Sequence, residues 1–331
     1  MAVTLKDVAL RAGVSRSAVS RTFTEGAPVS SKTRKKVENA AAELGYSPNV
    51  LASSLTTGRT KLVGLVSNNF HNPVFLQVFD RFTRVLQHRG LRPLLVNLSS
   101  ETDPSHSIRM LRQYSVDAVI VASSTLSPSF AKAFHDAGLP VVHSFGRHTH
   151  SPRVHVVGID NIAAGRLAAN ALIDRGYRRI GMMGGPDTAT SAQDRLTGFL
   201  EVTREHPNVD ASYTFAEAYS FEAGRAEMTR LLADQRAEAY FCGDDVLSIG
   251  ALSAAQSANL SVPDDVGFLG LNDMEMAGWQ NINLTTIRNP INEIVDTSIE
   301  LVVSMLDNPD LPPQARLFDC QLVERGTLRP V

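Results

Sequence analysis

From residue 61 onward, short apolar runs alternate with helical stretches, and this alternation limits the possible folds most. The strand candidates lie at residues 61–67, 94–98, 116–122, 141–145, 154–159, 179–184, 239–242, 266–270 and 317–324. Helical stretches at 74–90, 163–175 and 246–258 lie between them. Such alternation predicts parallel sheets covered by helices. Because the runs are almost wholly apolar, we expect strands buried on both faces.

The length of the chain favours several domains. Its 331 residues exceed what one compact core usually supports. We therefore expect residues 61–331 to form two doubly wound lobes.

Composition indicates the class of protein and its compartment. A chain that is 43% hydrophobic and 20% charged has ordinary globular composition. No apolar run approaches the ~18 residues of a membrane span, and the first residues lack a secretory apolar segment. Two cysteines fit a reducing compartment. We expect a cytoplasmic protein.

The first 46 residues differ from the rest, because their apolar spacing predicts three short helices. Thr4 and Asp7 resemble a capping box at the first helix, and Gly13 ends it. Ser15 can cap a second helix over 15–23. A third runs from residue 30 or 31 to Gly45. One face of the first helix carries Leu5, Val8, Ala9 and Ala12.

Charge is distributed unevenly along the chain. Residues 1–60 hold nine Lys or Arg and four Asp or Glu, whereas residues 61–331 have a net charge of −7. The total of −2 hides this division. A basic N-terminal part on an acidic body indicates that only the former meets a polyanion; a chance fluctuation is the alternative.

Two short helices joined by a tight turn predict a helix-turn-helix, whose second helix enters the DNA major groove. Arg16 and Ser17 are the expected base readers, because Arg forms two hydrogen bonds with guanine. Other positions are expected to contact phosphates, namely Thr4, Arg21, Lys32 and Thr33. Ser20 also belongs to the exposed face. A plain surface helix is the alternative.

Residues 47–60 read as a hinge and linker. Residues 48–55 can form one short helix that begins with Pro48. That helix is too short to be stable alone, so we expect it to order on a partner.

Several motifs together resemble the lactose-repressor/galactose-repressor (LacI/GalR) family of transcription regulators. In the first 49 residues they are Val3-Thr4-Leu5-Lys6-Asp7-Val8-Ala9, Ala12-Gly13-Val14-Ser15, Val19-Ser20-Arg21 and Leu44-Gly45-Tyr46. Further along they are Asn72-Pro73-Val74-Phe75, Arg175-Gly176-Tyr177, Arg195-Leu196-Thr197-Gly198-Phe199 and Val262-Pro263-Asp264. The resemblance covers essentially the whole chain.

The resemblance implies a dimer that binds a near-palindromic operator, with one helix-turn-helix headpiece (residues 1–46) per half-site. It also implies that the hinge helix pairs in the minor groove, where Leu55 wedges into a base step and Ala52 permits close packing. Docking of Leu55 on the body is the alternative. The family usually has Thr at Ala18. The expected DNA-binding residues are Thr4, Leu5, Ser15, Arg16, Ser17, Ala18, Ser20, Arg21, Lys32, Thr33, Asn49, Ala52 and Leu55.

For residues 61–331 the resemblance implies a two-lobed fold like that of periplasmic binding proteins. We expect an N-lobe of about residues 61–161 and 289–320 and a C-lobe of about 162–288 and 321–331. Ligands of such sheets bind at the carboxyl ends of the strands. The expected effector-binding residues are His71, Asn72, Phe75, Ser123, Arg195, Phe221, Asp244 and Asn272.

Individual roles in that cleft also follow from the resemblance. Arg195 aligns with an arginine that holds ligand oxygens, and Phe221 with a stacking ring. Asp244 and Asn272 exchange the residue types that are usual there. The set suits a sugar or polyol; Arg195 with His71 and Arg147 would also suit an acidic sugar. Such an effector would switch a repressor by population shift.

Other chemistry finds little support. The histidines at 143, 148, 150 and 155 lack the spacing of a metal site, and phosphate-loop and hydrolase motifs are absent from the sequence. We expect no metal, no cofactor and no enzymatic activity. A solute-binding module without regulatory role, and a two-lobed sugar-modifying enzyme, are the alternatives.

Overall fold

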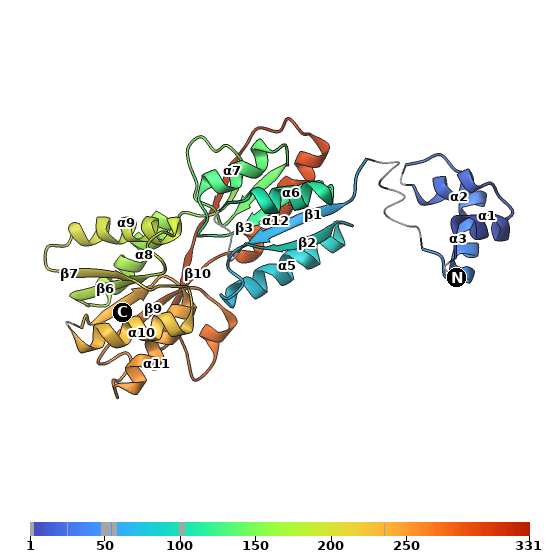
Figure 1. Cartoon of the computed structure of the whole chain (residues 1–331). Coiled ribbons are helices and arrows are strands. Elements are labelled where there is room, and N and C mark those ends of the chain that lie inside the picture. Colours follow the sequence, from blue (N-terminus) through green and yellow to red (C-terminus); the bar gives the residue numbers. More distant parts are fainter. Residues whose placement is uncertain (1–2, 25, 48–53, 55–57, 99–102, 235) are drawn as a thin grey trace. The chain divides into compact units, whose positions relative to one another are not determined.

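The computed structural model describes every residue except 1–2, 25, 48–53, 55–57, 99–102 and 235. The chain divides into two compact units, Met1–Lys61 and Leu62–Val331, and Figure 1 shows the elements of each.

The first unit contains the helices α1 (Leu5–Ala12), α2 (Arg16–Phe23) and α3 (Ser31–Leu44). The predicted capping box is confirmed, because the Asp7 carboxylate accepts hydrogen bonds from the Thr4 amide and hydroxyl at 2.8 and 2.6 Å. Gly13 and Gly45 end α1 and α3 in the left-handed conformation, where glycine is favoured. The core of this unit is formed by Val8, Ala9, Val19, Val37, Ala40 and Ala41.

The second unit holds two six-stranded sheets. In the N-lobe the strand order is β11-β5-β4-β3-β1-β2. These strands are β1 (Leu62–Ser67), β2 (Arg92–Asn97), β3 (Ala118–Ala122), β4 (Val141–Ser144), β5 (His155–Ile159) and β11 (Ala315–Phe318). All neighbours pair in parallel, as the alternating pattern predicts.

Helices cover both faces of the N-lobe sheet. They are α5 (Val74–His88), α6 (Ser105–Gln113), α7 (Pro128–Asp136) and α12 (Ile291–Asp307). Leu65 and Ile120 belong to the cluster that packs under α5 and α12, while Val66 and Val121 belong to the cluster under α6 and α7. Because adjacent residues point to opposite faces of a strand, wholly apolar strands serve both layers.

The C-lobe has the order β12-β10-β9-β8-β6-β7. Its strands are β6 (Arg179–Gly184), β7 (Asp210–Phe215), β8 (Ala239–Cys242), β9 (Gly267–Asn272), β10 (Thr286–Arg288) and β12 (Gln321–Val323). Its helices are α8 (Asn161–Asp174), α9 (Thr190–Arg204), α10 (Phe221–Ala233) and α11 (Asp245–Ser257), with a short 3-10 turn η1 (Glu275–Gly278). Only the β10–β12 pair is antiparallel among the strand pairs that the structure describes.

The expectation of one strand over residues 317–324 is wrong. That segment belongs to two strands, β11 in the N-lobe and β12 in the C-lobe, so it crosses between the lobes. The segments from β5 to α8 and from β10 to α12 cross as well.

Candidate functional site

The exposed face of α2 is the first candidate site. The Ser15 hydroxyl accepts a hydrogen bond from the Ala18 amide at 3.2 Å and so caps the helix. Val19 and Thr22 are buried against the core of the unit. The opposite face exposes Arg16, Ser17, Ser20 and Arg21.

Arg16 differs from the other side chains on this face. The Ser17 and Ser15 hydroxyls lie 2.9 Å apart, and the Arg21 Nε donates to the Ser17 carbonyl at 3.3 Å. Arg16, the first residue of α2, makes no hydrogen bond or ion pair with the residues described here. Its guanidinium is therefore available to a partner.

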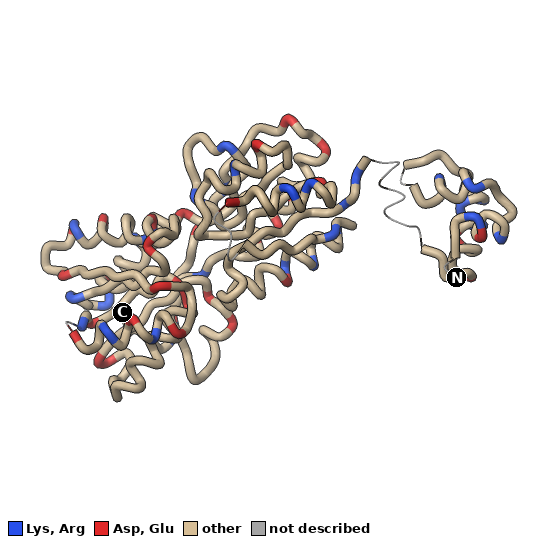
Figure 2. The backbone as a smooth tube through the Cα atoms, viewed as in Figure 1, with Lys and Arg blue, Asp and Glu red and all other residues tan. Residues whose placement is uncertain are grey.

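The remaining predicted DNA contacts surround α2 or lie elsewhere. Thr4 and Lys32 are exposed, whereas Leu5, Ala18 and Thr33 are half-buried. Cationic side chains occur on all three helices of this unit (Figure 2). Asn49, Ala52 and Leu55 lie outside the described residues, as does most of the predicted hinge helix.

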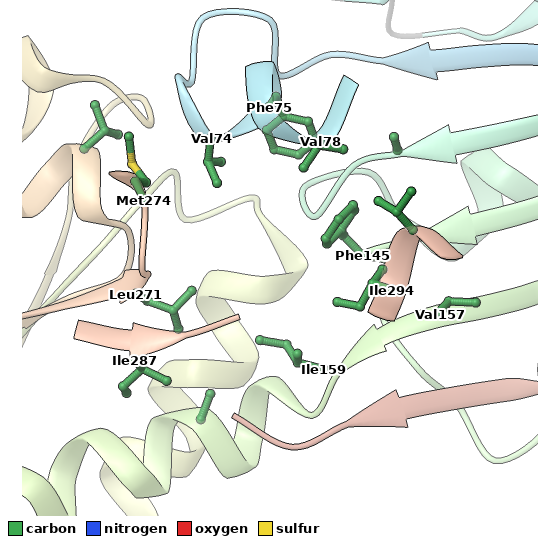
Figure 3. Close-up of a cluster of buried hydrophobic side chains, with 14 of the residues drawn as sticks. Val74, Phe75, Val78, Phe145, Val157, Ile159, Leu271, Met274, Ile287 and Ile294 are labelled. Atoms are coloured by element: carbon green, nitrogen blue, oxygen red, sulfur yellow. The ribbon is translucent and has the colours of Figure 1, made fainter. Parts of the chain in front are cut away.

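The second candidate site is an enclosed cavity of about 30 Å³ between the two lobes. It lies at the carboxyl ends of strands from both sheets. Figure 3 shows the apolar side chains that come to it from α5, from the loop after β4 and from the end of β5. Its lining comprises Val74, Phe75, Val78, Ser124, Phe145, Ile159, Asn161, Arg195, Tyr219, Asp244, Asn272, Asn289 and Ile291.

Asp244 connects the lobes at this cavity. Its Oδ2 accepts hydrogen bonds from the N-lobe Asn72 Nδ2 at 2.8 Å and from the C-lobe Asn272 Nδ2 at 2.9 Å. Its Oδ1 accepts from the Val246 amide at 2.9 Å and caps α11. Burial raises the pKa of Asp244 to about 6, since desolvation disfavours the charged form.

Arg195 is the cation of the cavity and is 5% exposed. Its Nε donates to Asn161 Oδ1 at 2.8 Å, and an Nη donates to the Gly243 carbonyl. Close packing of α8 on α9 fixes its position, because a Cβ on Gly165 would stand 2.0 Å from the Arg195 carbonyl oxygen.

A second polar contact joins the lobes beside this site. Arg147, in the loop after β4, makes a two-point ion pair with Asp194 on α9. Asp194 directly precedes Arg195 in the sequence. Arg147 is therefore already neutralised.

The structure brings five of the eight predicted effector residues together and leaves three aside. Phe75, Arg195, Asp244 and Asn272 line the cavity, with Asn72 bonded to Asp244. His71 is exposed, and Ser123 is buried in bonds to Asn68 and to its own loop. Phe221 packs against the core, and Tyr219 is the aromatic side chain from this loop that reaches the cavity.

Sequence reasoning missed Asn161 and Asn289. Asn161 follows β5 and Asn289 follows β10, so the rule that ligands bind at strand ends had the power to find both. Applying it required β10, a strand of three residues, to be recognised.

A wider cavity of about 950 Å³ adjoins the first and shares Asn272, Asn289 and Ile291 with it. It is lined by charged side chains of α5 and α12. Its arginines at 81, 84 and 288 each bond to a carboxylate. The enclosed cavity, which gathers the predicted residues, is the better candidate.

The four clustered histidines are separated in space by burial. His143 and His155 are buried in β4 and β5, while His148 and His150 lie on the loop between those strands, with ring centroids 5.8 Å apart. Burial lowers the pKa of His143 to about 4. Across the described ranges, His, Cys, Asp and Glu form no group of three suited to a metal ion.

None of the helices in the described part of the chain has the length and apolar character to cross a membrane.

Comparisons with known proteins agree with this architecture. The family of "bacterial regulatory proteins, lacI family" matches residues 4–49, and the "periplasmic binding protein-like domain" matches residues 169–328. Among solved structures, the Lac repressor dimer bound to operator and the anti-inducer ONPF is similar, with a TM-score of 0.86, 25% identity and 99% of each chain covered. The CelR–cellobiose complex has a TM-score of 0.72 and 28% identity, over 98% of this chain and 99% of that one.

Curated relatives match over nearly their whole length. The transcriptional repressor CytR of Escherichia coli K12 is 30% identical over 334 residues, which cover 99% of this chain and 97% of CytR. The ribose operon repressor of the same strain is 30% identical over 328 residues, covering 98% and 99%. On this evidence the chain belongs to the lacI family of bacterial regulatory proteins and is a DNA-binding transcription regulator.

Proposed function

We propose that this regulator binds a near-palindromic operator as a dimer, represses genes for the metabolism of a sugar or sugar derivative, and responds to a small effector between its lobes. The cytoplasm is its proposed compartment. The exposed face of α2 carries the proposal, because its free arginine is held on a rigid core in a part of the chain with net charge +5.

The division of labour on DNA follows from chemistry. Arg16 reads a base pair, and Arg21 with Lys32 contacts phosphates, which fix register but carry no sequence information. Two such units on one operator neutralise many phosphates, so binding weakens steeply as salt concentration rises. Asn49, Ala52 and Leu55 are proposed to contact the minor groove.

A two-fold operator requires two copies of the chain. We place the contact between the copies on α5, where Leu76 is 75% exposed. An apolar side chain on this scale of exposure favours a partner surface. The Lac repressor structure that resembles this chain is a dimer on its operator, which supports the proposal.

Selection of bound sites from random DNA tests the proposal. We expect enrichment of a two-fold symmetric sequence by the full chain. Recovery of unrelated sequences, with no common half-site, would contradict it and would favour a solute-binding module without regulatory role. Mass measurement in solution tests the dimer.

A further inference from the structure

The enclosed cavity has two walls of different chemistry. The N-lobe elements and the start of α12 contribute aliphatic and aromatic side chains, which are Val74, Phe75, Val78, Phe145, Ile159 and Ile291. Figure 3 shows Phe75 and Phe145 close together, and their ring centroids are 6.0 Å apart. The opposite wall presents Arg195, Asp244 and Asn272. A ligand that fills the cavity therefore meets an apolar face on one side and a polar face on the other.

The charges of the lining balance. Arg195 and Asp244 are its charged side chains. Arg147 is paired with Asp194, and His71 is exposed outside the cavity. The cations that would suit an acidic sugar are thus engaged or absent from the lining, and a ligand carboxylate would lie near Asp244, where like charges repel.

Two oxygen atoms of the polar wall demand donors. The Asn289 Oδ1 is buried without a hydrogen-bond partner in the described structure. Its orientation is fixed by its own amide group, since Asn289 Nδ2 donates to Asn272 Oδ1 at 3.2 Å, and a flip would set two oxygens together. A buried acceptor without a donor costs free energy, so a ligand hydroxyl or amine at Asn289 is favoured.

Asp244 Oδ2 already has a donor from the N-lobe, the Asn72 amide at 2.8 Å. The cavity of about 30 Å³ has roughly the volume of one water molecule. A ring compound enters only if the lining separates, and withdrawal of Asn72 from Asp244 opens the polar wall. In the empty cleft Asn72 holds the place that a ligand donor takes.

We infer that the effector is an uncharged ring compound with hydroxyl or amine donors along one edge and an apolar face opposite, the chemistry of deoxysugars, aryl glycosides and nucleosides. Asp244 and Asn289 accept its donors, and the ligand displaces Asn72. This inference rests on the proposed effector function and deepens it.

Calorimetric titration of the full chain with matched probes tests the ligand class. The pairs are L-fucose with L-galactose, phenyl with methyl β-D-glucoside, and uridine with D-ribose; D-glucuronate and D-galacturonate form the acidic arm. In at least one pair we expect the more apolar member to bind about tenfold or more tightly than its partner, and neither acid to bind. Tighter binding of an acid, or of every fully polar member, overturns the ligand class while leaving the cleft as the effector site. Binding by no probe contradicts the effector site itself, and operator selection then still tests DNA binding separately.

Two substitutions test the residue assignments with the tightest probe. Asn289→Ala should weaken binding about tenfold or more, and Asn292→Ala, an exposed neighbour outside the enclosed cavity, should leave it unchanged at equal melting temperature. Asn72→Ala should tighten binding, because it removes the competitor for Asp244. Unchanged binding by Asn289→Ala, or weaker binding by Asn72→Ala, overturns the respective assignment.

Discussion

Asn72 and Asp244, 172 positions apart in the sequence, join the two lobes through a 2.8 Å hydrogen bond between buried side chains. The amide comes from the turn between β1 and α5, and the carboxylate caps α11. Few contacts of this kind cross the cleft, so each one affects the angle between the lobes. The same carboxylate faces the proposed effector, which couples ligand chemistry to lobe position.

Asn72→Ala should let the lobes of the ligand-free protein separate, because a hydrogen bond to a charged group contributes about 1.5–3 kcal/mol. Spin labels on exposed positions 129 and 204, one in each lobe, measure the separation in a Cys320→Ser background. We expect a longer and broader distance distribution. Asn69→Ala, in the same loop, is the matched control. An unchanged distribution in Asn72→Ala would show that this contact does not hold the lobes.

Gly198→Ala should destabilise the C-lobe and displace Arg195. A Cβ at this position on α9 would stand 1.9 Å from the Ile162 carbonyl oxygen on α8, and overpacking of this kind typically costs about 1–3 kcal/mol. Thermal unfolding checks the prediction. Thr197→Ala, exposed on the same helix, should change stability by less than about 0.5 kcal/mol. Equal stability of the two variants would mean that α8 and α9 are not in tight contact.

Asp245 should make stability depend on pH. Burial raises its pKa from 3.8 to about 7, so between these values the folded chain holds a proton that the unfolded chain has released. Stability from this group is therefore present at low pH and is lost as pH rises through about 7. Chemical denaturation at pH 5 and pH 8 should show the wild type losing more than about 1 kcal/mol relative to Asp245→Asn.

Comparison with the variant isolates Asp245 from other buried groups. The pKa of His143 is lowered, which acts in the opposite direction, and the variant retains that histidine. The exposed Asp187→Asn controls for the loss of one carboxylate. A constant difference between wild type and Asp245→Asn across this pH range would contradict the assignment.

The sequence predicted best what depends on burial and local capping. The strands Arg179–Gly184 and Ala239–Cys242 have the predicted bounds, because continuous apolar runs mark strands covered on both faces. The strand Asp210–Phe215 was missed, since it is an edge strand with exposed polar positions. Edge strands lack the apolar run that a two-sided core requires.

The candidate site was predicted in part for related reasons. Asp244 and Asn272 were found because they follow clear strands, whereas Asn289 follows a three-residue strand that no periodicity marks. Tyr219 and Phe221 are two aromatic residues on one loop, and their roles depend on where α10 begins, at Phe221. Chain sequence alone does not fix which of two such rings turns inward.

Arg16 offers the most direct test of the central claim, that α2 reads DNA sequence. Wild type and Arg16→Ala should be compared on the selected operator and on every single-base variant of one half-site, at fixed salt concentration. We expect Arg16→Ala to lose about 1–3 kcal/mol on the operator and to lose discrimination at one base pair only. An equal loss on all sequences would make Arg16 a phosphate contact, and no loss at all would contradict the placement of α2 in the major groove.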